Sequence, residues 1–511
     1  MKGPSRFIIV GMHDGCVIDK AMIENVYELF RKLNSIPRAS HHEERVADFL
    51  CQYAESLGLE YNRDKENCVV IRKPATPGHE NAEPVVLLNH MDMVAVGDSS
   101  RPFDPLCDGI EAYVEDGWMK ARGTSLGADN GIGLSMALAV LADDSIVHGP
   151  LEVLTTTNEE DGMTGAAAMA TDFIRGRKVI NLDSEDYDTI TVGAAGAYLQ
   201  VAKFPIRRMD APEGLRFFRL TVSGGQGGHS GVDISKNRLN AIKLICQFIC
   251  AYKYIPHSED TREPDCHDPQ MEELYLSELN GGSANASIPG ECTAVVGVPE
   301  KEAQEFIEQF EFRKGRTERL CGLCEPNMTI SIEEVESPGM VIADDHYISL
   351  VIDNLPFGPL RMHDEMPGTV MTSNNIGVVR TNEDSITVSC HTRSFSDEEM
   401  ESVATGIGNH MRVYGAEVEV IMNTPGWQEN QHSDYMKLVD STFLDVLGFS
   451  PRKVAMHFVL EAGYYVQKFP GIEIACIGPR IIEPHSTKER VELSTVDDIF
   501  KVLIELLKRM A

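Results

Sequence analysis

Hydrophobic residues recur at helical spacing near the start of the chain and then gather in short continuous runs. The helical spacing predicts two amphipathic helices, over residues 22–33 and 46–57. The continuous runs, typical of strands buried on both faces, lie at 85–88, 151–154 and 179–182, with a helical stretch at 131–142. This first region is therefore predicted to be an α/β domain with a mostly parallel sheet.

Beyond residue 205 the pattern changes to an α+β order of strands and helices, and that order occurs twice. The first series predicts strands at 217–222, 274–279, 292–298 and 328–335, with helices at 237–252 and from Pro299. The second begins at His346 and predicts a helix, strands at 369–379 and 385–392, a helix opened by a capping box of Ser396 and Glu399, and a strand at 417–422. The two series predict a large inserted domain that is a doubled unit.

The turn signal Pro425-Gly426 predicts the end of the insertion. A helix at 435–447 and a last strand at 472–477 follow it. The predicted organisation is the first part of an α/β domain over 1–205, an inserted α+β domain over 206–425, and the second part of the α/β domain over 426–511.

The composition of the 511 residues, 42% hydrophobic and 24% charged, is typical of a globular protein. The 46 basic and 79 acidic residues give a formal net charge of −33, and such a field repels phosphate backbones and anionic lipids. No apolar run approaches the roughly 20 residues that cross a bilayer. We therefore expect neither a nucleic acid nor a membrane among the partners.

The cysteines and the amino-terminal residues predict the compartment. The twelve cysteines are scattered without a disulfide framework, which favours a reducing cytoplasm. The apolar patch at 7–10 is too short for a secretory signal. Cys321 and Cys324 form a CxxC with no second pair at zinc-finger spacing, so we interpret them as incidental thiols.

Histidine or acidic residues stand after several predicted strands and at the mouth of one predicted helix. They occur in Asn89-His90-Met91-Asp92, Gly127-Ala128-Asp129-Asn130-Gly131, Asn158-Glu159-Glu160-Asp161, Asn181-Leu182-Asp183-Ser184-Glu185 and Pro484-His485-Ser486-Thr487. Taken alone, each segment also fits a structural role, such as a helix cap or a solvated acidic turn. Together they lie where α/β folds build their sites, and their His, Asp and Glu side chains suit a zinc pair bridged by one carboxylate.

The order of these motifs resembles that of the dinuclear zinc peptidases that include glutamate carboxypeptidases and aminoacylases. The resemblance is carried by HMDMV, GTSLGADNGIG, TTNEEDGM, NLDSE and EPHST, and it covers the chain from about residue 20. The longer strings IRKPATPGHEN, LAVLADDSIVHGPLEVL and GGHSG are most similar to the branch of aminoacyl-histidine dipeptidases, also called Xaa-His dipeptidases or peptidase D. The resemblance implies zinc-dependent hydrolysis of unblocked dipeptides, including substrates like β-Ala-His.

By this resemblance, His90 and Asp183 would hold one zinc ion, Glu160 and His485 the other, and Asp129 would bridge them. Cobalt and manganese are other divalent metals that suit such ligands.

The resemblance also implies the roles of the neighbouring residues. Glu159 would be the general base for a metal-bridged hydroxide, and Asp92 would orient His90. The peptide between Asp129 and Asn130 would be cis.

By the same resemblance, the inserted domain would be a lid. His229 in GGHSG would donate a hydrogen bond to the developing oxyanion, and Arg393 would hold the terminal carboxylate of a small peptide substrate. Alone, each residue also fits a structural role. Relatives with a single lid unit take this histidine from a second subunit, whereas a doubled lid would let His229 act within one chain. A monomer and a homodimer both remain open.

Two segments depart from the family pattern. Ala286 stands where the family has asparagine, with Asn285 one place earlier, and residues 456–463 match only in part. Because both departures concern specificity, the preferred dipeptide stays open. Two other hypotheses are an N-acyl amino acid amidohydrolase with the same metals, and a non-catalytic metal- or peptide-binding homologue. Glu159 argues against the latter, since metal binding needs no additional base.

Overall fold

The computed structural model describes residues 20–99, 102–253, 273–343 and 347–511. The expectations for the amino-terminal patch at 7–10 and for His346 lie outside these residues. Contacts divide the chain into two compact units. The first comprises Met1–Val192, Glu429–Val454 and Tyr464–Ala511, and the second comprises Gly193–Gln428 and Ala455–Gly463. No helix in the described ranges is long and apolar enough to cross a membrane.

The sheet of the first unit has parallel strands at its centre and antiparallel strands towards its edges. Among the described residues its order is β1 (Glu60–Arg63), β2 (Val69–Lys73), β6 (Leu151–Thr156), β3 (Val85–His90), β7 (Lys178–Asn181), β23 (Glu473–Cys476), β8 (Thr189–Ala194) and β22 (Arg452–Met456). β3 pairs in parallel with β6 and β7, and β7 pairs in parallel with β23. β2 and β8 pair antiparallel with β6 and β23. The predicted parallel core is thus present within a mixed sheet.

Helices cover this sheet, four of them predicted from the sequence at 22–33, 46–57, 131–142 and 435–447. They are α1 (Lys20–Asn34), α2 (Glu44–Leu57), α3 (Ala128–Ala142), α4 (Thr164–Ala168), α9 (Asp434–Leu447), α10 (Ala462–Lys468) and α11 (Leu493–Arg509). α1 packs on α3, and α9 packs on α11. A small sheet of β24 (Ile481–Ile482), β25 (Arg490–Glu492), β5 (Trp118–Ala121) and β4 (Ala112–Glu115) completes the first unit.

The second unit is built on one long antiparallel sheet. Its order among the described residues is β16 (Thr329–Val335), β11 (Leu215–Ser223), β15 (Cys292–Pro299), β13 (Tyr275–Gly281), β19 (Val370–Thr381), β20 (Ser385–Ser394), β9 (Gly196–Pro205) and β21 (Glu417–Thr424), with β18 (Gly358–Met362) on β19. β13 pairs with β19, so the two predicted α+β series lie in adjacent halves of one sheet. β9 pairs with β20 and β21, and the second unit therefore begins before the expected boundary at 206.

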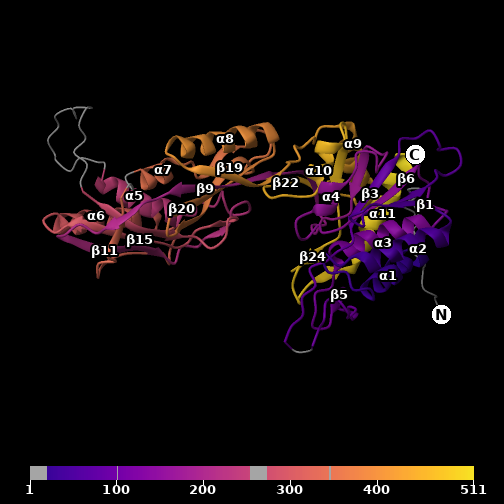
Figure 1. Ribbon diagram of the computed structural model, residues 1–511. Coiled ribbons are helices and arrows are strands. Elements are labelled where there is room, and N and C mark those ends of the chain that lie inside the picture. The colour runs from indigo at the N-terminus through magenta and orange to yellow at the C-terminus, as the bar shows by residue number, and fades with distance from the viewer. Residues whose placement is uncertain (1–19, 100–101, 254–272, 344–346) are drawn as a thin grey trace, which may run out of the picture. The chain divides into compact units, whose positions relative to one another are not determined.

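Four helices of the second unit lie along this sheet (Figure 1), and their apolar side chains share one hydrophobic cluster with it. They are α5 (Ala241–Lys253), α6 (Ala303–Cys321), α7 (Ile348–Asn354) and α8 (Asp397–Val413). α5 begins later than predicted because the Asn240 side chain accepts from the backbone N–H groups of Ile242 and Lys243, which makes it a helix cap. Half of the predicted capping box forms on α8: Ser396 accepts from the backbone of Glu399, whose carboxylate instead accepts from Thr372.

Candidate metal centre and active site

The predicted ligands reach one region of the first unit because of where its elements end. β3, β6 and β7 are parallel, so their carboxyl ends meet at one edge of the sheet. His90 is the last residue of β3, while Glu160 and Asp183 lie in the segments after β6 and β7. Asp129 lies at the start of α3, and the peptide that follows it is cis, as expected. His485 lies between β24 and β25.

The structure brings the five predicted ligands together in two sets that share Asp129. In each set, one ligand atom per residue lies within 4.8 Å of the others; the sets are His90, Asp129 and Asp183, and Asp129, Glu160 and His485. Oδ1 of Asp129 lies 3.1 Å from Nε2 of His90, and its Oδ2 lies 3.1 Å from Nε2 of His485. The two oxygens of one carboxylate therefore face two different imidazoles, as a bridging ligand requires.

The surroundings of His90 test whether these residues suit a metal ion. Its Nδ1 lies 3.4 Å from Asp92, while its Nε2 lies 3.1 Å from Asp129 and 3.2 Å from Asp183. A neutral imidazole carries one proton, so it cannot donate to carboxylates on both sides. With the proton on the Asp92 side, the lone pair of Nε2 faces two carboxylates and needs a cation between them. The donor set thus fits a divalent metal.

The electrostatics of the site agree with this. Hydrogen bonds and charges from Asp129 and Glu160 raise the pKa of His485 to about 11, against its burial. Burial would raise the pKa of Asp129, but hydrogen bonds from His485 and His90 outweigh it and lower that pKa. Burial raises the pKa of Glu160 and of Asp183. Three carboxylates packed this closely need positive charge from imidazolium protons or from metal ions.

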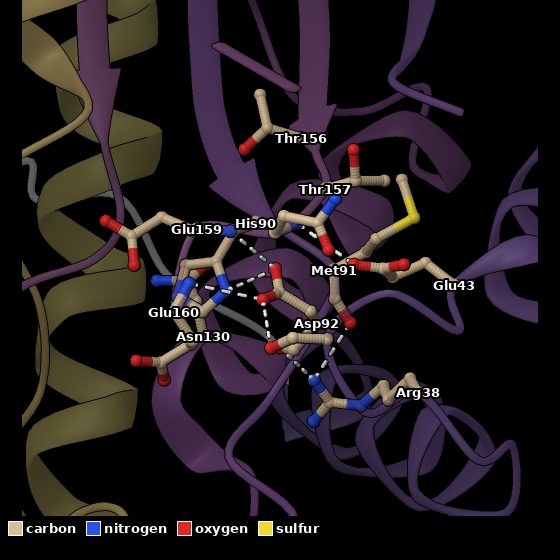
Figure 2. Close-up of polar contacts among 12 residues, drawn as sticks. Arg38, Glu43, His90, Met91, Asp92, Asn130, Thr156, Thr157, Glu159 and Glu160 are labelled. Atoms are coloured by element: carbon tan, nitrogen blue, oxygen red, sulfur yellow. Dashed lines mark hydrogen bonds and ion pairs between the residues drawn. The ribbon is translucent and has the colours of Figure 1, made fainter. Parts of the chain in front are cut away.

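Asp92 organises this edge of the sheet. It is fully buried, and besides facing His90 it accepts from the backbone N–H groups of Glu159 at 3.1 Å and Glu160 at 3.2 Å. Ser40 donates to it at 2.8 Å. Figure 2 shows His90, Asp92 and the two glutamates gathered here.

Sequence reasoning missed several residues that hold the candidate ligands. Asn130 donates to the Asp183 carboxylate at 2.6 Å. Arg38 donates to the backbone carbonyl of Asp92. Glu489 accepts from the backbone N–H of Ala128, the residue before Asp129. Arg38 could have been noticed in the sequence as a charged residue between apolar neighbours just after α1.

The two predicted lid residues lie close together in the second unit. Arg393 on β20 is 4% exposed, and its Nε donates to Ser230, the neighbour of His229, at 3.4 Å. His229 is half-buried on β12 (Gly228–His229), which pairs with β14 (Ser287–Ile288). Ala286, where the family pattern is broken, accepts from the backbone of Ser230 at 2.7 Å, so the departure touches the His229 segment through main-chain atoms.

The comparison with known proteins settles the family. The sequence pattern of peptidase family M20/M25/M40 matches residues 86–509. The chain belongs to that family. This M20 peptidase is 34% identical over 488 residues to the protein named cytosol non-specific dipeptidase of Escherichia coli (strain K12), an alignment that covers 95% of this chain and 97% of the relative. The membership confirms the predicted family.

Solved structures agree with this assignment. The M20 peptidase superposes on aminoacylhistidine dipeptidase from Vibrio alginolyticus with a TM-score of 0.88 and 34% identity, covering 96% of this chain and 97% of that one. Aminopeptidase PepT from Bacillus cereus matches with a TM-score of 0.54 at 15% identity, which shows the shared fold alone.

Proposed function

We propose that this M20 peptidase is a dinuclear metal dipeptidase that hydrolyses unblocked dipeptides, with Xaa-His dipeptides such as β-Ala-His among its substrates. The observation that carries the proposal is the pair of ligand sets sharing Asp129. The names of the E. coli and Vibrio relatives support the substrate class. Because one relative is named for broad specificity and the other for aminoacylhistidine, the preferred dipeptide is a matter for measurement.

Two divalent cations, for which we propose zinc, would polarise the scissile carbonyl and lower the pKa of a shared water toward neutrality. His90 and Asp183 would hold one, Glu160 and His485 the other, and Asp129 both. Nitrogen and oxygen ligands of this kind suit zinc, and also cobalt or manganese.

Glu159 is the proposed general base. It accepts the proton of the attacking water and then delivers it to the departing amine. Its backbone N–H is held by Asp92, next to the ligand Glu160, so it starts from a fixed segment beside the metal centre. Glu160 is the proposed metal ligand, and metal binding does not need the adjacent Glu159. This additional carboxylate is the reason to favour an enzyme over a non-catalytic homologue.

Arg393 is proposed to bind the terminal carboxylate of the substrate. Among the residues that the structure describes, no carboxylate pairs with this buried guanidinium, and burial lowers its pKa to about 10. A buried cation without an anion is costly, and a substrate carboxylate held by two parallel hydrogen bonds would offset that cost.

His229 is proposed to donate to the oxyanion. Its Nδ1 accepts from the backbone N–H groups of Gly231 at 3.2 Å and Val232 at 3.1 Å, so the ring proton is on Nε2. Burial, and then the charge of Arg393, lower the pKa of His229, which keeps it neutral near pH 7. A neutral ring with a free Nε2–H is the form that such a donor needs. We propose that the second unit, which bears both residues, is the lid.

We also propose a cytoplasmic enzyme, since the E. coli relative is named for the cytosol and Cys321 and Cys324 are free thiols.

One hydrolysis panel tests the function. It contains β-Ala-His, Gly-His, other dipeptides, tripeptides and acetylated amino acids, assayed with zinc and after chelation. Metal-dependent cleavage of free dipeptides supports the proposal. Preferential cleavage of acetylated amino acids would make the chain an N-acyl amino acid amidohydrolase, and binding without turnover would make it a non-catalytic homologue.

A further inference from the structure

A single buried carboxylate binds the whole turn that presents Asp129. Glu489 is 3% exposed. Its Oε2 accepts from the backbone N–H groups of Leu126 at 2.7 Å and Gly127 at 2.9 Å, and its Oε1 accepts from those of Ala128 at 2.8 Å and Asp129 at 3.3 Å. Four successive N–H donors thus converge on one side chain, and only a carboxylate has acceptor positions for all four.

Arg38 holds the same turn from another side. It is 1% exposed, and its Nη2 donates to the carbonyl of Gly127 at 2.6 Å. Its Nη1 donates to the carbonyls of Met91 at 3.1 Å and Asp92 at 2.9 Å (Figure 2). The peptide groups of Gly127 are therefore held between a buried anion and a buried cation. The guanidinium also joins the turn to the segment after β3.

The turn has no room to shift toward Arg38. Gly127 has a φ of 67°, and a Cβ added there would lie 2.6 Å from Nη2 of Arg38 and 2.7 Å from Sδ of Met93. A side chain at this position would displace the guanidinium. Glycine is thus required both by the backbone conformation and by the packing.

Glu489 also belongs to the segment that carries His485. It stands four residues after that histidine, and its own N–H donates to the carbonyl of Ser486 at 3.1 Å. A displacement of the Asp129 turn would therefore move the His485 segment, and a displacement of the His485 segment would move the turn. His485 and Asp129 are 3.1 Å apart at their nearest ligand atoms.

We propose that Glu489 is a positioning residue that fixes the direction of the bridging carboxylate of Asp129 and its separation from His485, with Arg38 as its counterpart. The inference rests on the proposed metal centre, but it concerns how the ligands are held. Residues that orient metal ligands typically contribute about 10- to 100-fold to metal affinity or activity.

The test is Glu489→Gln, in which an amide NH2 replaces one carboxylate oxygen. This NH2 group cannot accept from the two backbone N–H groups that the oxygen now binds. Glu152→Gln is the matched control. Glu152 is also 3% exposed and accepts from the backbone N–H groups of Arg175 at 2.7 Å and Gly176 at 2.9 Å, but it stands near the start of β6, away from the ligands. Both substitutions remove a buried charge that accepts from backbone N–H groups, and the charge of Glu152 also pairs with Nε of Arg72 at 2.9 Å.

Zinc affinity is measured by titrating the metal-free proteins, together with the rise in Tm on adding zinc and the kcat and KM for a dipeptide. We expect Glu489→Gln to lose about 10- to 100-fold in zinc affinity and to lower kcat with little change in KM. Glu152→Gln should bind zinc like the wild type, and Glu489→Asp, which keeps both oxygens, should recover part of the loss. If Glu489→Gln does not fold, Glu489→Asp and Arg38→Lys are measured in the same way.

Wild-type zinc affinity in Glu489→Gln, or in both substitute variants where it does not fold, would overturn the inference and leave the proposed function intact. An equal loss of zinc affinity in the Glu489 and Glu152 variants would also overturn it, because the effect would then be one of general stability. A wild type that binds no divalent metal would overturn both proposals.

Discussion

The carboxylate of Asp92 lies 3.4 Å from Nδ1 of His90. The same carboxylate accepts from the backbone N–H groups of Glu159 and Glu160. One buried side chain thus contacts both an imidazole at the end of β3 and the backbone of a glutamate pair after β6. It links the two neighbouring strand ends at which the proposed ligands and the proposed base stand.

Asp92→Asn tests this link. The amide keeps the size of the side chain but places an NH2 group where a carboxylate oxygen now accepts, so we expect metal affinity or kcat to fall about 10- to 100-fold. Zinc titration and steady-state kinetics measure both. Ser40→Ala, which removes only the donor to Asp92, should have a smaller effect, and an Asp92→Asn enzyme with normal metal binding and kcat would remove Asp92 from the site.

Glu159→Gln should leave about two metals bound per chain while kcat falls by about 100- to 10,000-fold, since the amide cannot accept a proton. Elemental analysis and hydrolysis assays on the same preparation separate binding from turnover. The companion variant Glu160→Gln should lose metal as well. Full activity in Glu159→Gln would require another general base.

Asp129→Ala should lose both metal and activity. Two cations about 3.5–4 Å apart repel one another and need a shared anion between them. Elemental analysis after dialysis against metal-free buffer checks the occupancy. A variant that keeps both metals would show that Asp129 is no bridge.

Arg393→Lys should lower kcat/KM for free dipeptides by at least about tenfold, because an ammonium keeps the charge but loses the planar two-bond contact. Dipeptide amides should be poor substrates of the wild type, and the variant should lose little further activity on them. Equal rates on free dipeptides and their amides in the wild type would reopen the substrate class.

The second unit should become less stable as the pH falls below about 6.5. Burial, and then the charge of Arg393, lower the pKa of His391 from 6.5 to about 3. Between these values the unfolded chain binds a proton at His391 that the folded chain excludes, so this histidine alone lowers the free energy of unfolding with falling pH by at most about 1.4 kcal/mol per pH unit. Above pH 6.5 His391 is largely neutral in both the folded and the unfolded chain, so it no longer lowers the free energy of unfolding.

His391→Gln should reduce this dependence without abolishing it, because burial also lowers the pKa of His457, in the same unit, to about 3. Urea unfolding between pH 5 and 7 can be followed through Trp427, which is buried in the second unit, once Trp118, the other tryptophan of the chain, is replaced by Phe. The exposed His432 provides a control substitution in the first unit. An unchanged pH slope in His391→Gln would exclude this histidine as the cause.

The sequence alone indicated the positions of the proposed ligands, because buried parallel strands are recognisable as apolar runs and their carboxyl ends meet at one edge. His90, Glu160 and Asp183 follow three such runs. The same pattern placed Asp129 at the mouth of a predicted helix and His485 after the last predicted strand, and the family motifs then implied which proposed metal each would bind.

The tertiary structure decided what holds those ligands. Arg38 donates to backbone carbonyls, and Glu489 accepts from backbone N–H groups. Because nearly every residue carries these groups, no sequence motif identifies the partners of Arg38 and Glu489. Likewise, β9 belongs to the second unit because it pairs with β20 and β21 through hydrogen bonds between residues far apart in the sequence. Local patterns of apolar and polar residues determine which elements form, whereas the contacts between distant backbone groups exist only once the chain has folded.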